Sequence, residues 1–105
     1  MPAYNMELFI YESIKSILIQ TYQQFELIIV DDGSTDGTLD VIRAYNDPRI
    51  KLIIHKNNQG IVAARNAALK ASTGNYIAML DADDIAFSNR LEIQIKYLNE
   101  KNVDL

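Results

Sequence analysis

The sequence predicts an α/β fold with a mostly parallel sheet and helices on both of its faces. Three observations lead to this prediction. The hydrophobic period alternates along the chain between that of a helix and that of a strand. The strand-like runs are short, and the one at residues 25–30 is rich in β-branched apolar residues, as in strands that are buried on both faces. The connections between the runs are short, which favours right-handed crossovers between parallel strands.

The first half of the chain is predicted to contain a helix, a buried strand and a shorter helix. Apolar residues at i, i+4, i+7 and i+8, counted from Ile10, predict a helix over about residues 6–20. Residues 25–30, FELIIV, predict a strand that is buried on both faces. Residues 31–38, DDGSTDGT, are dense in turn formers, and the apolar spacing from Leu39 onward predicts a short helix.

The second half continues the alternation. Residues 50–54 predict a second strand, and the alanine-rich residues 60–72 predict a helix of high intrinsic propensity. Residues 76–80 predict a third strand. Asn89, followed by a glutamate three residues later, predicts the start of the last helix.

Both ends of the chain carry only short pieces of further structure. Met1 and Pro2 leave room for no more than a stub of strand before the first helix, and residues 103–105 could open another strand. The length of 105 residues suits one domain of ordinary size and excludes two. We therefore expect residues 1–105 to form a single domain whose first strand is truncated.

Composition excludes several classes of function. With 49% apolar residues, 4 Gly and 2 Pro, the chain is globular and neither disordered nor fibrous. The absence of cysteine excludes a disulfide framework and a thiolate zinc site. A net charge of -4 without a basic stripe argues against nucleic acid as a partner. Neither a signal segment nor a membrane-spanning segment is visible, so we predict a cytoplasmic protein.

Polar groups that are remote in the sequence are predicted to meet at one rim of the sheet. Asp31 and Asp32 come directly after the first full strand, and residues 81–84, DADD, come directly after the third. Tyr4 and Asn5 lie at the same edge if the N-terminal stub is the end of a strand. Ligands of open α/β sheets bind beyond the carboxyl ends of the strands. This convergence predicts a binding site.

The DADD segment is a candidate metal site. Asp81 and Asp83 bring two carboxylates together, and Mg²⁺ or Mn²⁺ is usually held by one or two carboxylates together with substrate phosphates. The structural alternative is a turn in which Asp83 or Asp84 caps a helix. A second acidic cluster at the same rim favours the metal and, with it, a phosphorylated ligand.

The DDGSTDGT segment is partly explained as a turn in which Ser34, Thr35 or Asp36 caps the next helix. That reading does not explain the two adjacent carboxylates, one of which must point to the rim. There it can accept a hydrogen bond from an imide N–H such as that of uracil. No glycine-rich phosphate-binding motif occurs. We interpret His55, the one histidine, as structural; Arg65 either reaches a phosphate or base or is simply solvated.

Five segments taken together closely resemble the family 2 glycosyltransferases with the GT-A fold. They cover nearly the whole chain in the right order: MPAYN at 1–5, IKSILIQTY at 14–22, FELIIVDDGSTDGT at 25–38, GIVAARN at 60–66 and DADD at 81–84. The resemblance implies a transferase that moves a sugar from a nucleotide-diphosphate donor, usually a UDP-sugar, with inversion. It also implies Mn²⁺ or Mg²⁺ as cofactor and a saccharide or lipid-linked acceptor. The parent protein or its acceptor would bring the enzyme to the inner face of a membrane.

The resemblance also implies roles for individual residues. The nucleotide would be bound by residues from four segments, namely Pro2, Ala3, Tyr4, Asp32, Arg65 and Asp81. Asp32 would bind the base, and Asp81 would approach the ribose or the metal. Asp83 would coordinate the metal that bridges the diphosphate.

The chain departs from the family pattern in two places. A full first strand precedes the Pro-Ala-Tyr-Asn segment in such enzymes, and here it is nearly missing. The general base of the family lies well beyond the metal motif, so we expect it beyond Leu105. The chain then corresponds to the donor-binding portion, a GT-A half-domain that is incomplete at both ends.

Two alternatives stay open at this point. A phospho-receiver signalling domain also places an acidic pair after one strand and another aspartate, here Asp81, after a later strand. The remaining chain is too short for the further strands that such a domain needs. The other alternative is a piece of a protein with no stable function of its own.

Overall fold

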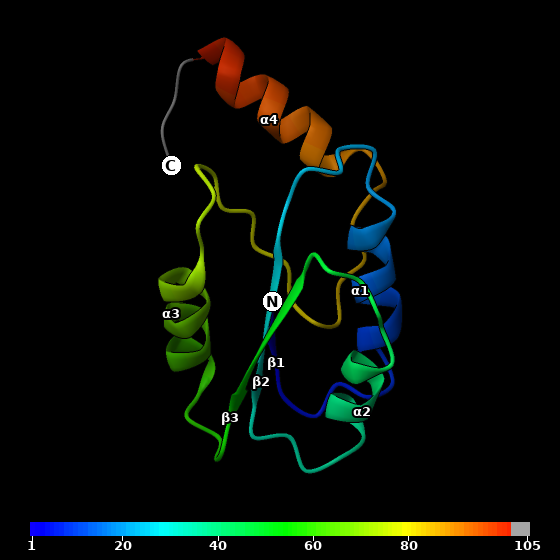
Figure 1. The fold of residues 1–105 in the computed structure, drawn as a ribbon, viewed down its shortest axis with the longest axis vertical. Helices are drawn as coiled ribbons and strands as arrows, with labels where there is room; N and C mark the ends of the chain where they lie inside the picture. Colours follow the sequence, from blue (N-terminus) through cyan, green and yellow to red (C-terminus); the bar gives the residue numbers. More distant parts are fainter. Residues whose placement is uncertain (102–105) are drawn as a thin grey trace.

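The fold, seen in a computed structural model that describes residues 1–101, is a small parallel sheet between helices (Figure 1). The elements in chain order are β1 (Pro2–Ala3), α1 (Ile10–Leu18), β2 (Leu27–Asp32), α2 (Thr38–Arg43), β3 (Ile50–His55), α3 (Ile61–Ala71) and α4 (Arg90–Lys101). None of the helices within the described residues is both long enough and apolar enough to span a membrane.

The three described strands pair in the order β1-β2-β3, and both pairings are parallel. Ala3 lies opposite Asp31, while β2 and β3 are in register from Leu27 with Ile50 to Asp32 with His55. All six residues of the central strand β2 are buried, as expected for a strand with helices over both of its faces.

The helices form two layers on the sheet. Figure 1 shows α3 on one side of the strands and α1 and α2 on the other. Because side chains alternate along a strand, Ile29 of β2 packs into one apolar cluster with Ile10, Ile14 and Ile42, while its neighbour Val30 packs with Ala64 of α3. The predicted α/β class, with helices on both faces, is confirmed.

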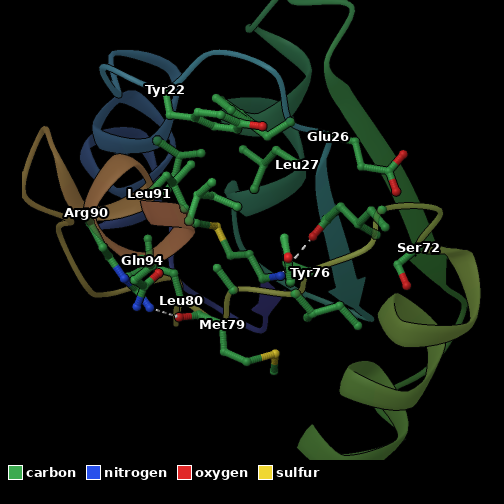
Figure 2. A pocket seen from close by; sticks show the side chains of 18 of the residues that line it. Tyr22, Glu26, Leu27, Ser72, Tyr76, Met79, Leu80, Arg90, Leu91 and Gln94 are labelled. Carbon is green, nitrogen blue, oxygen red and sulfur yellow. Dashed lines mark hydrogen bonds between the residues drawn. The ribbon is translucent and has the colours of Figure 1, made fainter. Parts of the chain in front are cut away.

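The predicted third strand is wrong: residues 76–80 form no strand in the structure. A groove of about 800 Å³ is lined by this segment and by residues of β1 and β2 (Figure 2). The edge of the sheet available on that side is β1, which has two residues, one of them a proline without an N–H. Residues 76–80 therefore lack the ladder of backbone groups that a strand requires.

Several boundaries also differ from the prediction. β2 ends at Asp32, so both aspartates belong to the strand and do not follow it. The first helix begins only at Ile10, since Met6 lies at a turn where its carbonyl accepts the N–H of Phe9 at 3.0 Å. β1 is a two-residue stub, as predicted. The strand expected at 103–105 lies outside the described residues.

Candidate functional site

One cleft of about 490 Å³ opens where β1 and β2 end and α3 begins. It brings together residues that are far apart in the sequence. Its lining consists of Pro2, Ala3, Tyr4, Met6, Asp32, Asn58, Gly60, Ile61, Ala64, Asp81, Ala82 and Asp83. Six of the seven residues predicted to bind nucleotide or metal are in this list, and Arg65 is the exception. The predicted convergence at the rim is therefore present in the fold.

Tyr4 is held at the cleft by the turn that follows β1. Its side chain is 42% exposed, so the ring is accessible to a ligand. The next residue, Asn5, has a φ of 51° and accepts the Thr35 N–H at 2.8 Å through its Oδ1. The Asn5 N–H in turn donates to Ser34 Oγ at 3.0 Å. The serine and threonine of the DDGSTDGT segment thus fix the chain beside Tyr4.

Asp32 is the most heavily bonded carboxylate of the cleft. Its Oδ1 accepts the Gln59 N–H at 3.0 Å and lies 2.8 Å from Nδ1 of His55. Its Oδ2 accepts the Gly60 N–H at 2.9 Å. Since a carboxylate offers about four acceptor positions, Oδ2 retains one for a ligand. Asp32 therefore ties β2 to the start of α3 and still presents an acceptor to the cleft.

The bonding of Asp32 also decides its charge. Burial alone would raise the pKa of this carboxyl, but the hydrogen bonds from His55, Gln59 and Gly60 outweigh burial and hold the pKa below its ordinary value. Asp32 is consequently an anion at neutral pH. An ionised carboxylate is an acceptor only, which suits an N–H donor on a ligand.

Asp31 points to the opposite side of the sheet, because successive side chains of a strand alternate. It is 2% exposed, does not line the cleft, and its Oδ1 has no hydrogen-bond partner among the described residues. The rim position expected for one member of the pair therefore belongs to Asp32.

Two glycines shape the loops around Asp32. Gly33 has a φ of 74°, and a Cβ there would lie 2.6 Å from the backbone carbonyl carbon of Asn57 and the nitrogen of Asn58. Gly60 has a φ of 96° and precedes the first turn of α3, where its N–H reaches Asp32. Both positions favour glycine, since residues with a Cβ rarely adopt this backbone conformation.

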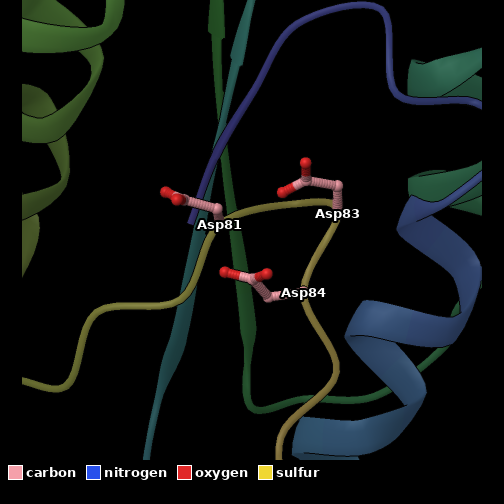
Figure 3. Close-up of side chains that lie close together, drawn as sticks. All are labelled: Asp81, Asp83 and Asp84. Atoms are coloured by element: carbon pink, nitrogen blue, oxygen red, sulfur yellow. The ribbon is translucent and has the colours of Figure 1, made fainter.

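Asp81, Asp83 and Asp84 form a candidate metal site on the bend that follows residue 80 (Figure 3). One carboxylate oxygen from each lies within 4.8 Å of the others, and all three residues are exposed. Hard oxygen donors in a small group suit Mg²⁺ or Mn²⁺, so the residues fit the cofactor that the resemblance implies. Asp84, for which the sequence suggests only a helix-capping role, lies close enough to Asp81 and Asp83 to act as a third ligand.

Arg65 lies beside this acidic group but does not line the cleft. Its Nη2 is 3.5 Å from Oδ1 of Asp81, and about half of each side chain is exposed. Such an exposed pair contributes little to stability, because water screens it. Arg65 is thus available to change partner when a phosphate approaches.

His55 is the part of the site that our sequence analysis missed. The sequence alone favours a structural role for His55, because a lone histidine without a catalytic partner forms no recognisable motif. The signal that could have found it is strand register: β2 and β3 are parallel neighbours, and their last residues, Asp32 and His55, lie opposite each other. Asn58 and Gly60 were missed because a loop cannot be placed at the cleft without the fold.

The known proteins to which this chain is similar in sequence include several that are named glycosyltransferases. The chain is 45% identical over 103 residues to WfgD of Escherichia coli, a UDP-Glc:alpha-D-GlcNAc-diphosphoundecaprenol beta-1,3-glucosyltransferase; the match covers 98% of this chain and 41% of that protein. An uncharacterized glycosyltransferase of Rickettsia conorii is 46% identical over 102 residues, which are 96% of this chain and 17% of the relative.

Solved structures share the fold. The crystal structure of Staphylococcus aureus TarS 1–349 in complex with UDP matches with a TM-score of 0.88 and 33% identity, over 94% of this chain and 30% of that one. The mannosyltransferase PcManGT from Pyrobaculum calidifontis, in complex with GDP-Man and Mn²⁺, matches with a TM-score of 0.84 and 32% identity, over 92% and 30%. These neighbours support the GT-A fold.

This chain spans only a part of its relatives, with coverage of the first curated ones between 15% and 42% of their length. The whole length of the chain, in contrast, matches one family. The sequence profile of glycosyl transferase family 2 aligns with residues 1–105. Together with the cleft and its two acidic segments, this match shows that the chain belongs to glycosyltransferase family 2.

Proposed function

We propose that this chain binds the donor of an inverting glycosyltransferase, a UDP-sugar, together with Mn²⁺ or Mg²⁺. The observation that carries the proposal is the single cleft in which Tyr4, Asp32 and the Asp81–Asp83 pair meet. Residues 1–105 are the donor-binding portion in this proposal. Removal of the acceptor proton is assigned to a residue outside the chain, since the acids lining the cleft all have donor-binding roles.

The nucleoside end of the donor is assigned to β1 and β2. Pro2, Ala3 and Tyr4 line one wall of the cleft, and the accessible Tyr4 ring offers an apolar surface to a base. Asp32 is ionised and keeps an acceptor position on Oδ2. Uracil carries an imide N–H that this acceptor can bind, whereas cytosine has a lone pair at the same ring position.

The diphosphate end is assigned to the acidic bend and Arg65. Asp83 and Asp81 would hold the metal, with Asp84 near enough to assist. When bound, the metal neutralises charge on the leaving diphosphate. Arg65, which is already within 3.5 Å of Asp81, supplies a positive charge on the same side.

The relatives support the donor class and name an acceptor class. Two E. coli relatives are named as UDP-Glc-dependent enzymes that act on alpha-D-GlcNAc-diphosphoundecaprenol. The TarS structures hold UDP or UDP-GlcNAc, while PcManGT holds GDP-Man with Mn²⁺. A UDP-sugar and a lipid-linked saccharide acceptor at the inner face of a membrane are therefore our proposal for the full enzyme.

The test is a calorimetric titration of the chain with UDP, in MnCl₂ and then in EDTA, repeated with CDP. We expect Mn²⁺ to tighten UDP binding by about tenfold, which corresponds to about 1.4 kcal/mol. CDP should bind more weakly than UDP, because cytosine has no N–H at ring position 3 to donate to Asp32 and presents a lone pair there instead. Binding that is equal with and without metal would contradict the metal assignment, and equal affinity for CDP would contradict the base assignment.

Because the chain belongs to glycosyltransferase family 2, the phospho-receiver domain is no longer needed as an alternative. Asp81 does not follow a strand, and it lies in a group of three exposed carboxylates. We therefore carry one function forward.

A further inference from the structure

Helix α1 carries a stripe of buried polar side chains that the donor site does not account for. Ser13, Ser16 and Gln20 lie at i, i+3 and i+7, on one side of the helix and its extension. They are 0%, 5% and 0% exposed, respectively. Buried polar groups need hydrogen-bond partners, so the identity of those partners indicates what the stripe does.

The partners are backbone groups of the segment that carries the acidic bend. Ser13 Oγ donates to the Ala82 carbonyl at 2.8 Å, and Ser16 Oγ accepts the Ala86 N–H at 3.1 Å. Gln20 makes two further bonds to this part of the chain. Its Nε2 donates to the Phe87 carbonyl at 2.6 Å, and its Oε1 accepts the Leu91 N–H at 3.0 Å.

The acidic segment depends on these bonds because it has no strand or helix of its own. Residues 81–89 lie between the unformed strand and α4, and most of their side chains are exposed. Ala82 and Ala86 are the buried exceptions, at 2% and 9% exposed. Both are held through their backbone by a serine of α1, and both also join the apolar cluster that contains Ile14 and Ile17.

The contact at Ala82 lies at the centre of the metal site. Ala82 separates Asp81 from Asp83, so fixing its carbonyl against α1 keeps the two flanking carboxylates on the exposed side. If the Ser13 hydroxyl is removed, a buried carbonyl loses its partner, and the backbone must turn to recover one from water. That turn would move both carboxylates.

We propose that Ser13, Ser16 and Gln20 are positioning residues that hold the acidic bend in its metal-binding conformation. The inference rests on the proposed donor-binding function. It assigns to α1, which does not line the cleft, control over the metal-dependent part of donor binding.

The test compares Ser13→Ala and Ser16→Ala with Ile42→Val. The control removes one methyl group from the same apolar core, at a residue of α2 that makes none of these bonds. Two quantities are measured: amide hydrogen exchange without ligand, and UDP affinity in MnCl₂ and in EDTA. Exchange reports the bend directly, and the difference between the two affinities isolates the contribution of the metal.

In both serine variants we expect faster amide exchange at residues 82–86, with β2 and β3 unchanged. UDP affinity in MnCl₂ should fall by about threefold to tenfold, the range expected for one lost hydrogen bond, while affinity in EDTA stays the same. Ile42→Val should neither speed exchange specifically at residues 82–86 nor change the difference between the UDP affinities in MnCl₂ and in EDTA. Gln20→Met, which loses its hydrogen bonds to the 87–91 segment but keeps the volume, serves as a further variant if a serine variant folds poorly.

The inference is overturned if the serine variants keep the wild-type metal effect, or if they change binding only as much as Ile42→Val does. A failure of the proposed function gives a different result. In that case the wild-type chain itself shows no effect of Mn²⁺ on UDP binding, and the ligand-binding part of this inference fails with it.

Discussion

Asp31 and Asp32 show how one position along a strand changes the chemistry of a side chain. Both residues end β2, and both are almost fully buried. Asp32 finds three partners at the end of β3 and the start of α3, whereas Asp31 faces the other side and has an oxygen without a hydrogen-bond partner among residues 1–101. The sequence presents two identical residues, and only the strand register tells which of them can serve a ligand.

Asp32 should make the stability of the chain depend on acidic pH. Because its pKa is lowered on folding, its carboxylate contributes stability that is complete above the unfolded pKa, about 3.9, and is lost as the pH falls through the lower folded value. We expect Asp32→Asn to be less stable at pH 7 and to lose less stability between pH 5 and pH 2.5. Urea unfolding followed by circular dichroism at each pH measures both effects.

Asp47→Asn is the matched control for the binding role of Asp32. Asp47 also has a lowered pKa, because it accepts hydrogen bonds from Arg49, but it lies outside the cleft. In both variants the free energy of unfolding should fall less than in the wild type as the pH is lowered. Only Asp32→Asn should lose UDP affinity. An Asp47→Asn variant that binds UDP as poorly as Asp32→Asn would argue against a direct contact between Asp32 and the base.

Gly33 should be far less tolerant of alanine than Gly74. Alanine at residue 33 combines a positive φ with a contact at 2.6 Å to the backbone of residues 57 and 58, so it should cost about 1–3 kcal/mol. Gly74 has neither problem, since its nearest contact would be 3.4 Å. Both substitutions restrict the unfolded chain equally, so urea denaturation of the pair isolates the folded-state strain. Equal stabilities would contradict this account of the 33–58 contact.

At the scale of elements, the sequence predicts a helix or strand correctly when its own pattern of apolar residues determines it. The prediction fails when the element needs a pairing partner from a distant part of the chain. The helical spacing from Ile10 and the apolar run of β2 are both confirmed, because each pattern requires burial of its own residues. Residues 76–80 have an equally strand-like pattern. They form no strand, because β1 offers a two-residue edge and a strand needs a ladder.

Arg49 is the side chain that joins the start of β3 to the end of α1. Its Nε and Nη2 donate to the two oxygens of Asp47 at 3.0 and 2.9 Å, and Nη2 also donates to the Leu18 carbonyl at 3.1 Å. Its guanidinium carbon lies 4.6 Å from the centre of the Phe25 ring. A planar guanidinium can make all these contacts at once, whereas an ammonium cannot.

We therefore expect Arg49→Ala to lower the free energy of unfolding by about 1–3 kcal/mol, with Arg49→Lys recovering only a small part of it. Lys51→Ala is the comparison, because the Lys51–Glu26 ion pair is half exposed on the lysine side and should contribute less to stability than the contacts of Arg49. Urea denaturation of the three variants ranks their free energies of unfolding. Full recovery by lysine would show that charge alone, and not the fork of donors, links the two elements.

At the scale of the whole molecule, two hollows lie on the same sheet. The cleft at the carboxyl ends of β1 and β2 holds acids from two remote segments, while the larger groove is lined by residues 76–80 together with residues of β1 and β2. The position of the first was predictable, because parallel strands must bring their carboxyl ends to one edge. The second was not predictable, since it exists where the expected third strand does not form.

Ligand binding at the cleft should stabilise the whole fold, because the cleft is assembled from β1, β2, α3 and the acidic bend and cannot exist in the unfolded chain. With UDP and Mn²⁺ at about 100 times the dissociation constant, linkage gives about 2.7 kcal/mol, which is a rise in Tm of about 10–20 °C for a domain of this size. Asp83→Ala should keep the wild-type Tm without ligand, because the residue is exposed. With UDP and Mn²⁺, its Tm should rise only as far as that of the wild type does with UDP in EDTA. If the metal-dependent rise in Tm survives in Asp83→Ala, residues other than Asp83 bind the metal.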